Sequence, residues 1–224
     1  MMEHPLNVSM LFGMGFSHTY WHVVMTFIVV LVCLALGGFA LRAKAEVPGR
    51  GQNAVELLVK AIYGMCDDVM GHHGRPYIPV IFGIGLYVAF SNLLGLIPGF
   101  LAPTSNLNST VAPALVVFVL YQYIGIKTHG SHYIKHFLGP VSWLAPLMLI
   151  IELIGHLARP LSLSMRLFGN IFGEDLVIII LFMLVPFLVP LPMFFLGIFT
   201  GLLQAYVFMM LSMIYISGAL EEAH

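Results

Sequence analysis

The longest apolar run in this chain is residues 143–184, WLAPLMLIIELIGHLARPLSLSMRLFGNIFGEDLVIIILFML, and it contains no obvious loop. About 42 helical residues would extend about 63 Å, twice what a perpendicular crossing of the bilayer requires. The segment must therefore tilt steeply, bend, or lie partly in the membrane plane. Pro146 and Pro160 are the expected bend points, because proline removes a backbone donor and clashes with the preceding turn.

The composition of the whole chain is that of an integral membrane protein. Of its 224 residues, 60% are hydrophobic and only 8% are Asp, Glu, Lys or Arg, too few charges to cover a soluble domain. A net charge of −1 and the lack of a basic tract give no sign of a nucleic-acid partner. Cys33 and Cys66 lie far apart and predict neither a disulfide framework nor a cysteine metal site.

Four further apolar regions bring the number of predicted hydrophobic helical regions to five. They are residues 20–41, 77–101, 110–126 and 190–218. We therefore expect an all-α integral membrane protein, with residues 1–224 forming one membrane domain. Between the first two regions, residues 55–70 have apolar positions at helical spacing and predict an amphipathic interfacial helix. That helix is equally compatible with a plain connector and with a docking site for another subunit.

The distribution of basic residues predicts the orientation in the membrane, because short cytoplasmic loops are enriched in Lys and Arg. The basic residues between spans are Arg42, Lys44, Arg50, Lys60, Arg75, Lys127 and Lys135. They follow the first and third spans, whereas residues 102–109 and 185–189 hold none. This pattern predicts an outside N-terminus and a cytoplasmic C-terminus.

A stripe of polar side chains runs along the 143–184 segment. At about 100° per residue, six positions fall within roughly 40° of one direction around the helix, and only Asp175 points elsewhere. The six positions are Glu152, His156, Arg159, Arg166, Asn170 and Glu174. Intramembrane charges usually face a bundle interior or an aqueous cavity and mark an ion pathway. Arg159 and Asn170 are about equally compatible with purely structural roles.

Arg166 divides this stripe. Its guanidinium stays charged at physiological pH, and its position near the bilayer centre costs at least about 2.5 kcal/mol, which favours a functional role. In the predicted orientation Glu152 and His156 are nearer the cytoplasm, whereas Glu174 and Asp175 are nearer the outside. A fixed positive charge repels a passing proton, so the two clusters cannot form one continuous proton wire. The arrangement favours two half-channels joined by a moving carrier.

The last apolar region carries one large polar residue, Gln204. Gly197 and Gly201 form a G-x-x-x-G face on nearly the same side and would let a neighbouring helix approach closely. We expect the face that carries Arg166 to be the partner of Gln204. The alternative is a simple packing motif in which Gln204 bonds to the backbone.

Several strings in the sequence resemble subunit a of the rotary F-type ATP synthases of bacteria. The most specific are ARPLSLSMRLFGN at 158–170 and LQAYVF at 203–208. Weaker matches occur at 52–56, 91–98 and 103–110, so the resemblance covers nearly the whole chain. It implies a non-catalytic, proton-translocating stator subunit, with the last two helices forming a long tilted hairpin against the rotor's c-ring.

The resemblance also implies roles for single residues. Arg166 corresponds to the essential arginine that faces the c-ring carboxylate, with Gln204 beside it and Asn170 one turn along. Glu152 matches the acid of the cytoplasmic half-channel, and Glu174 with Asp175 matches the region of the outer acid. The polar outer-loop positions are Asn106, Asn108 and Thr110.

Two positions depart from the family pattern. Some members pair the outer acid with a histidine on the last helix, where this chain has Gly197, and two adjacent carboxylates occupy the acid site. Which of Glu174 and Asp175 carries protons stays open, although an ungapped match favours Asp175, which would then face the last helix. Some members also have Asp at the position of Asn106.

The resemblance implies partners and a location. The partners are the c-ring, the subunit b peripheral stalk and the lipid bilayer, and the location is the bacterial inner membrane. The translocated ion is H⁺, with Na⁺ possible, and no cofactor or metal is implied. A metal site at His129, His132 and His136 is disfavoured for want of an acidic or cysteine partner cluster. A stand-alone channel or secondary transporter is the alternative function, but no inverted repeat is evident.

Overall fold

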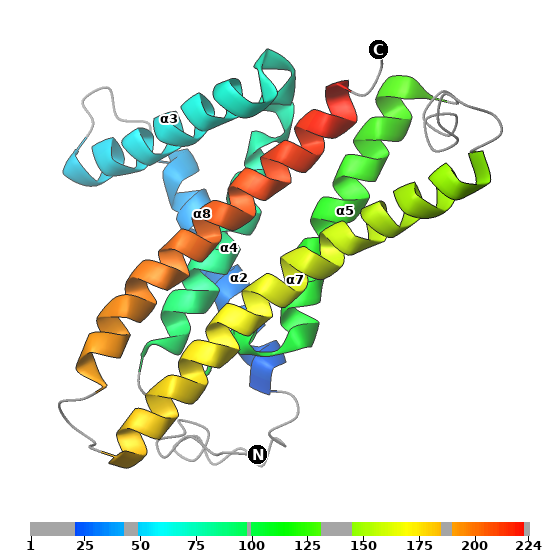
Figure 1. The fold of residues 1–224 in the computed structure, drawn as a ribbon. Coiled ribbons are helices and arrows are strands. Elements are labelled where there is room, and N and C mark those ends of the chain that lie inside the picture. The colour runs from blue at the N-terminus through cyan, green and yellow to red at the C-terminus, as the bar shows by residue number, and fades with distance from the viewer. Residues whose placement is uncertain (1–20, 43–48, 98–99, 131–144, 185–189, 222–224) are drawn as a thin grey trace.

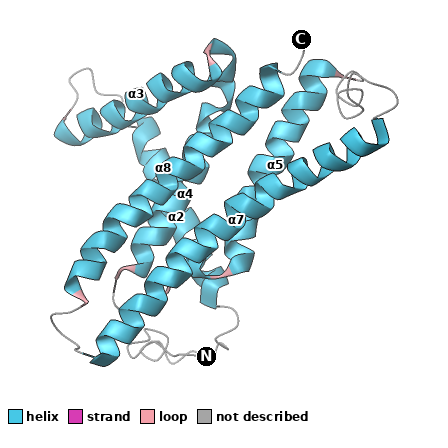
Figure 2. Cartoon of the chain, viewed as in Figure 1, coloured by secondary structure: helices cyan, strands magenta, loops and turns pink. Residues whose placement is uncertain are grey.

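A computed structural model of the chain describes residues 21–42, 49–97, 100–130, 145–184 and 190–221. Within these ranges every regular element is a helix (Figure 2). Five helices among the described residues are long and apolar enough to cross a membrane. They are α2 (Trp21–Arg42), α4 (Ile78–Gly95), α5 (Leu107–His129), α7 (Ala145–Leu184) and α8 (Leu191–Glu221). The predicted all-α membrane fold with five hydrophobic regions is confirmed.

The fourth hydrophobic region forms one uninterrupted helix. α7 has 40 residues, and Pro160 lies inside it without ending it. α7 and α8 run side by side across the face of the bundle, with α4 and α5 behind them (Figure 1). α4 packs mainly on α8 and α5 mainly on α7, so each long helix is supported by a different neighbour.

The predicted interfacial helix is α3 (Arg50–Met70), which lies across one end of the bundle (Figure 1). Gly71 follows it with φ of 62°, a conformation that a residue with a Cβ rarely adopts. The chain then continues into the short helix η2 (His72–Tyr77). Arg75 of η2 bonds Asp67 of α3 at 2.7 Å and holds the pKa of that exposed carboxyl below its usual range. This ion pair helps to set the angle between the interfacial helix and the bundle.

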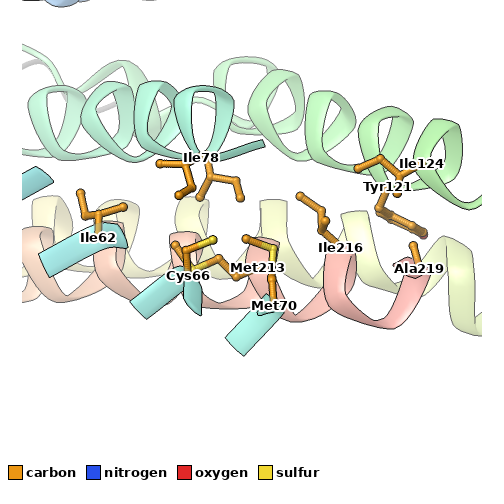
Figure 3. Close-up of a cluster of buried hydrophobic side chains, with 10 residues drawn as sticks. Ile62, Cys66, Met70, Ile78, Tyr121, Ile124, Met213, Ile216 and Ala219 are labelled. Carbon is orange, nitrogen blue, oxygen red and sulfur yellow. The ribbon is translucent and has the colours of Figure 1, made fainter. Parts of the chain in front are cut away.

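Two clusters of buried apolar side chains hold the helices together. The first joins α3 to the bundle, and Figure 3 shows Ile62, Cys66 and Met70 of α3 with Met213 and Ile216 of α8. The second lies at the level of Arg166 and contains Val88, Ala114, Val117, Leu163, Leu167, Ala205 and Phe208. It fixes the rotation of α7 about its own axis, because Leu163 and Leu167 are 1% and 0% exposed.

Candidate functional site

Arg166 lies in the middle of α7 with its side chain exposed. The other side of the same turns, which carries Leu163 and Leu167, is buried against the bundle. Within the described part of the chain, no carboxylate lies within ion-pair distance of Arg166. The helix therefore presents a permanent positive charge on its outer face, where a group outside this chain could meet it.

Asn170 and Gln204 connect the two long helices one turn from Arg166. The Asn170 side-chain amide donates a 2.7 Å hydrogen bond to Gln204 Oε1, and Gln204 is only 4% exposed. The prediction that Gln204 meets the face of α7 that carries Arg166 is confirmed through this contact. This contact helps to fix the register of α8 beside the charged residue, because the buried Gln204 side chain would lose its partner if α8 shifted.

The glycine face of α8 packs closely against side chains of other helices: Asn92 of α4 at Gly201 and Glu174 of α7 at Gly197. At Gly201, Asn92 of α4 packs closely, since a Cβ there would lie 3.2 Å from Asn92 Cβ, and the Asn92 amide donates to Gly201 O at 3.2 Å. The Thr104 hydroxyl completes this buried network by donating to Asn92 Oδ1 at 2.8 Å. The prediction that small residues of α8 permit close helix approach is confirmed at this position.

The two adjacent carboxylates at 174 and 175 have different neighbours. Glu174 accepts a 2.9 Å hydrogen bond from Thr200 of α8. Its carboxylate also occupies the space above Gly197, because a Cβ built there would overlap Glu174 Oε1. Asp175 instead lies beside Ser105 in η3 (Pro103–Ser105), the short helix that precedes α5, and the Ser105 hydroxyl donates to Ala102 O at 2.8 Å. We expected Asp175 to face the last helix, but it is Glu174 that does so, because the stripe side of α7 faces α8 at this level.

The other end of the stripe packs against α5. Glu152 is one-third exposed, and its Oε1 lies 3.4 Å from His156 Nε2. His156 is 3% exposed. Its Nδ1 lies 3.1 Å from the Tyr121 hydroxyl and 3.2 Å from Gln122 Nε2. The structure therefore places the predicted pair of Glu152 and His156 in direct contact, with the histidine on the buried side.

Arg159 has aromatic neighbours. Its guanidinium carbon lies 5.6 Å from the centre of the Tyr121 ring and 5.5 Å from that of Tyr215. Two cation–π contacts of this kind hold a charge at membrane depth and tie α5, α7 and α8 together. These contacts therefore support a structural role for Arg159.

The predicted outer-loop residues differ in exposure. Asn106 caps α5, its Oδ1 accepting from Asn108 N at 3.0 Å, and the Asn108 side chain is exposed. Thr110 is fully buried; its hydroxyl donates to Leu107 O at 2.9 Å and lies 3.3 Å from Ser164 of α7. Asn106 and Thr110 thus also have local structural roles.

The disfavoured histidine cluster cannot be placed as a whole. His132 and His136 lie outside the described residues. His129 is described, and its Nε2 lies 3.1 Å from the carbonyl oxygen of Ala219.

Several side chains at these sites were not singled out from the sequence. They are Tyr121, Gln122, Thr200, Ser105 and Thr104. Their hydroxyl and amide groups are common in apolar helices and short loops, so only Gln122, a large amide in the third span, carried a usable signal.

The fold and these sites define a class: a multi-pass membrane protein with ionisable groups along one long helix. A family model described as ATP synthase A chain matches residues 23–217. ATP synthase subunit a 3 of Pelobacter propionicus is 54% identical, with 100% of this chain and 94% of that protein covered.

Two other relatives agree. ATP synthase subunit a of Geobacter sulfurreducens is 50% identical over 98% of this chain and 93% of that protein. That of Citrifermentans bemidjiense is 48% identical, with both chains fully covered. The chain belongs to the ATP synthase subunit a family and is a membrane subunit of the Fo sector.

Proposed function

We propose that this chain translocates protons through two separate half-channels, aqueous paths that each reach partway across the membrane. Arg166 stands between them and faces the carboxylates of a rotating c-ring. A ring carboxylate would lose its proton beside Arg166, since a nearby cation favours the ionised form of an acid. The subunit itself catalyses no covalent reaction. Membership of the ATP synthase subunit a family argues against a stand-alone transporter.

The observation that carries the proposal is the exposure of Arg166 on a helix whose acids lie at its two ends. Glu152 lies 14 positions before it and Asp175 nine positions after it. At 1.5 Å per residue these offsets correspond to about 21 Å and about 14 Å along the axis. Such distances are too long for direct proton exchange between the two acids, which supports a carrier that moves past Arg166.

The rotor is the proposed partner of the outer face of α7 and α8. Beside Arg166 and Asn170 this face presents large apolar side chains, among them Leu161, Phe195, Phe199 and Leu203. An exposed apolar surface with one charge suits sliding contact with a ring of apolar helices that carry one acid each. The peripheral stalk subunit b and lipid are the proposed neighbours of the remaining surface.

The proposed location is the bacterial inner membrane, with the N-terminus outside and the C-terminus in the cytoplasm. In this orientation Glu152 and His156 belong to the cytoplasmic half-channel. Glu174, Asp175 and Asn108 belong to the outer one, together with the capping residues Asn106 and Thr110. The proposed ion is H⁺.

Replacing Arg166 by alanine tests the proposal. We expect Arg166→Ala to abolish ATP-driven acidification of inverted membrane vesicles. The subunit should still insert and assemble, because the exposed side chain supports no packing in this chain. The matched control is Lys127→Ala, which removes an exposed charge at the end of α5. Near-normal pumping by Arg166→Ala, at matched subunit levels, would refute the proposal.

A further inference from the structure

A cavity of about 770 Å³ lies between α2, α4 and α5. Among the described residues that line it, none is charged, and only Thr26, Cys33 and Tyr87 carry a polar side-chain group. The other walls are apolar side chains and glycines, among them Val30, Leu34, Gly37, Phe82, Gly83 and Val116. None of the described lining residues belongs to α7 or α8, the helices that carry the proposed proton route.

The chemistry of the walls favours hydrocarbon over water as the content of this cavity. A water molecule held by a protein needs about two to four polar partners, whereas these side chains offer only two hydroxyls and one thiol over the whole cavity. Gly37 and Gly83 keep the cavity wide, because a Cβ built on either would meet no atom of another helix within 4 Å. An unfilled space would deprive the walls of dispersion contacts, so an apolar ligand is stabilised there.

The cavity reaches about halfway across the membrane. Along α2 its walls run from Thr26 to Gly37, 11 positions or about 16 Å at 1.5 Å per residue. On α4 they begin at Pro79, the second residue of that helix. Because α3 and η2 follow α2 and precede α4 in the chain, Gly37 and Pro79 mark the end of the cavity on the α3 side of the bundle. A length of about 16 Å is about half of the hydrocarbon thickness of about 30 Å, the depth of one leaflet.

This length favours acyl chains over a helix of a partner protein. A transmembrane helix needs about 20 residues and would require a groove along the full thickness of about 30 Å. The chains of a phospholipid start at the headgroup level and end near the bilayer midplane, so they fill the depth of a single leaflet. The apolar walls, the glycines and the length of the cavity therefore agree on the same class of ligand.

We propose that this cavity is a phospholipid site, in which acyl chains enter between Gly37 and Pro79 and extend along α2 and α4 to α5. Val116 of α5 lines the cavity, and the next residue, Val117, packs in the core cluster with Leu167 of α7. A bound chain therefore supports α5 beside the residues that hold it against α7. The proposal is independent of the proposed proton route, and its tests measure lipid binding and not pumping.

Photolabelling of the assembled complex tests the site. The complex is loaded in vesicles with a phospholipid that carries a diazirine in one acyl chain, then washed with detergent to remove bulk lipid and illuminated. Val30 and Leu34 line the cavity, whereas Phe27 and Leu31 are exposed on the same helix and do not line it. We expect at least about fivefold more label on the first pair than on the second, because a chain enclosed by walls is retained in the wash. Equal labelling of the two pairs would show surface lipid only and would overturn the proposal.

Filling the cavity is the second test, with a control one position away. Gly37→Phe combined with Gly83→Phe adds two rings to the space, whereas Gly38→Phe adds a ring at a glycine that has open space around it but does not line the cavity. At matched levels of the complex, the double variant should lose at least about fivefold of the label on Val30 and Leu34, and Gly38→Phe less than about twofold. Unchanged labelling in the double variant would overturn the proposal.

A cross-link from Cys33 decides between lipid and protein even where the double variant fails to assemble. Cys33 lines the cavity, and Cys66 is replaced by alanine so that it is the one thiol of this chain. In native membranes, a thiol reagent with a photoreactive end on Cys33 should give an adduct whose added mass is that of a phospholipid. An adduct with a helix of another subunit would show that protein fills the cavity and would overturn the proposal.

Discussion

The acidic residues near the two ends of α7 have different kinds of neighbours. At the end that begins at Ala145, Glu152 contacts a buried histidine, and a second basic group, Arg159, lies two turns along. At the other end, the neighbours of Glu174 and Asp175 are the hydroxyls of Thr200 and Ser105. Within the described residues, no basic side chain lies within ion-pair distance of either acid at that end.

The difference follows from which helix supports each half of α7. The first half packs on α5, which supplies an aromatic ring and an amide. The second half packs on α8, which supplies glycines and the Thr200 hydroxyl, and on η3, which supplies the Ser105 hydroxyl. One helix can therefore give chemically similar carboxylates a fixed orientation at one end and a compact, hydroxyl-lined setting at the other. The consequence for the proposed half-channels is that their acids need not respond alike to substitution.

The largest expected effect on pumping is the difference between substitutions of Asp175 and of Glu174. We predict that Asp175→Asn lowers ATP-driven pumping in inverted vesicles by about tenfold or more, the range of a lost proton-transfer group. Asp175 faces η3, in the loop proposed to be on the outer side, whereas Glu174 is held between the helices by Thr200. Glu174→Gln should lose only about twofold to threefold, since the Gln carbonyl can still accept from Thr200.

Matched subunit levels are the control for this comparison. A larger loss of pumping in Glu174→Gln than in Asp175→Asn would show that Glu174 is the residue that transfers protons. If both single variants pump normally, the outer half-channel depends on neither carboxylate alone, and the assignment of this end is wrong.

A smaller effect is expected at Gly197. A methyl group there would overlap the Glu174 carboxylate and press on Leu96, so Gly197→Ala should displace Glu174 from Thr200. Because both obstructing groups are ends of flexible side chains, we predict a loss of only a few-fold in pumping. Adding Glu174→Asp to the Gly197→Ala variant shortens the acid and should restore part of the lost pumping. Gly64→Ala, on α3 with open space around it, is the control. Full activity of Gly197→Ala would mean that the position of this carboxylate is unimportant.

The smallest effect on transport is expected from cysteines that report sidedness. Asn108 is exposed, so Asn108→Cys should change pumping by less than about twofold. A membrane-impermeant thiol reagent should reach it only from outside, whereas it should reach Glu152→Cys only from the cytoplasm. Cys33 and Cys66 are first replaced by alanine, and Lys127→Cys serves as the cytoplasmic control. Labelling of both test positions from one side would contradict two separate half-channels.

Much of this architecture could be predicted from periodicity and length alone. Five apolar runs are long enough to span a bilayer, and the amphipathic spacing at 55–70 marks the interfacial helix α3. The stripe on α7 was also visible, because residues about 3.6 apart share a helix face whatever the helix packs on. Pro160, an expected bend point, lies inside the continuous 40-residue helix α7.

The residues alone were enough to indicate a membrane protein of the subunit a family with charge concentrated along one helix. The neighbours of each charge become known only from how the helices pack. Gln122 and His156 are 34 positions apart, Thr200 and Glu174 are 26 apart, and Asn92 and Gly201 are 109 apart. The pattern within one helix defines its faces but not the rotation and level at which another helix packs against it. That choice depends on how buried side chains such as Leu167 and Phe208 interlock, and it is what separates an exposed Arg166 from a buried His156 on the same stripe.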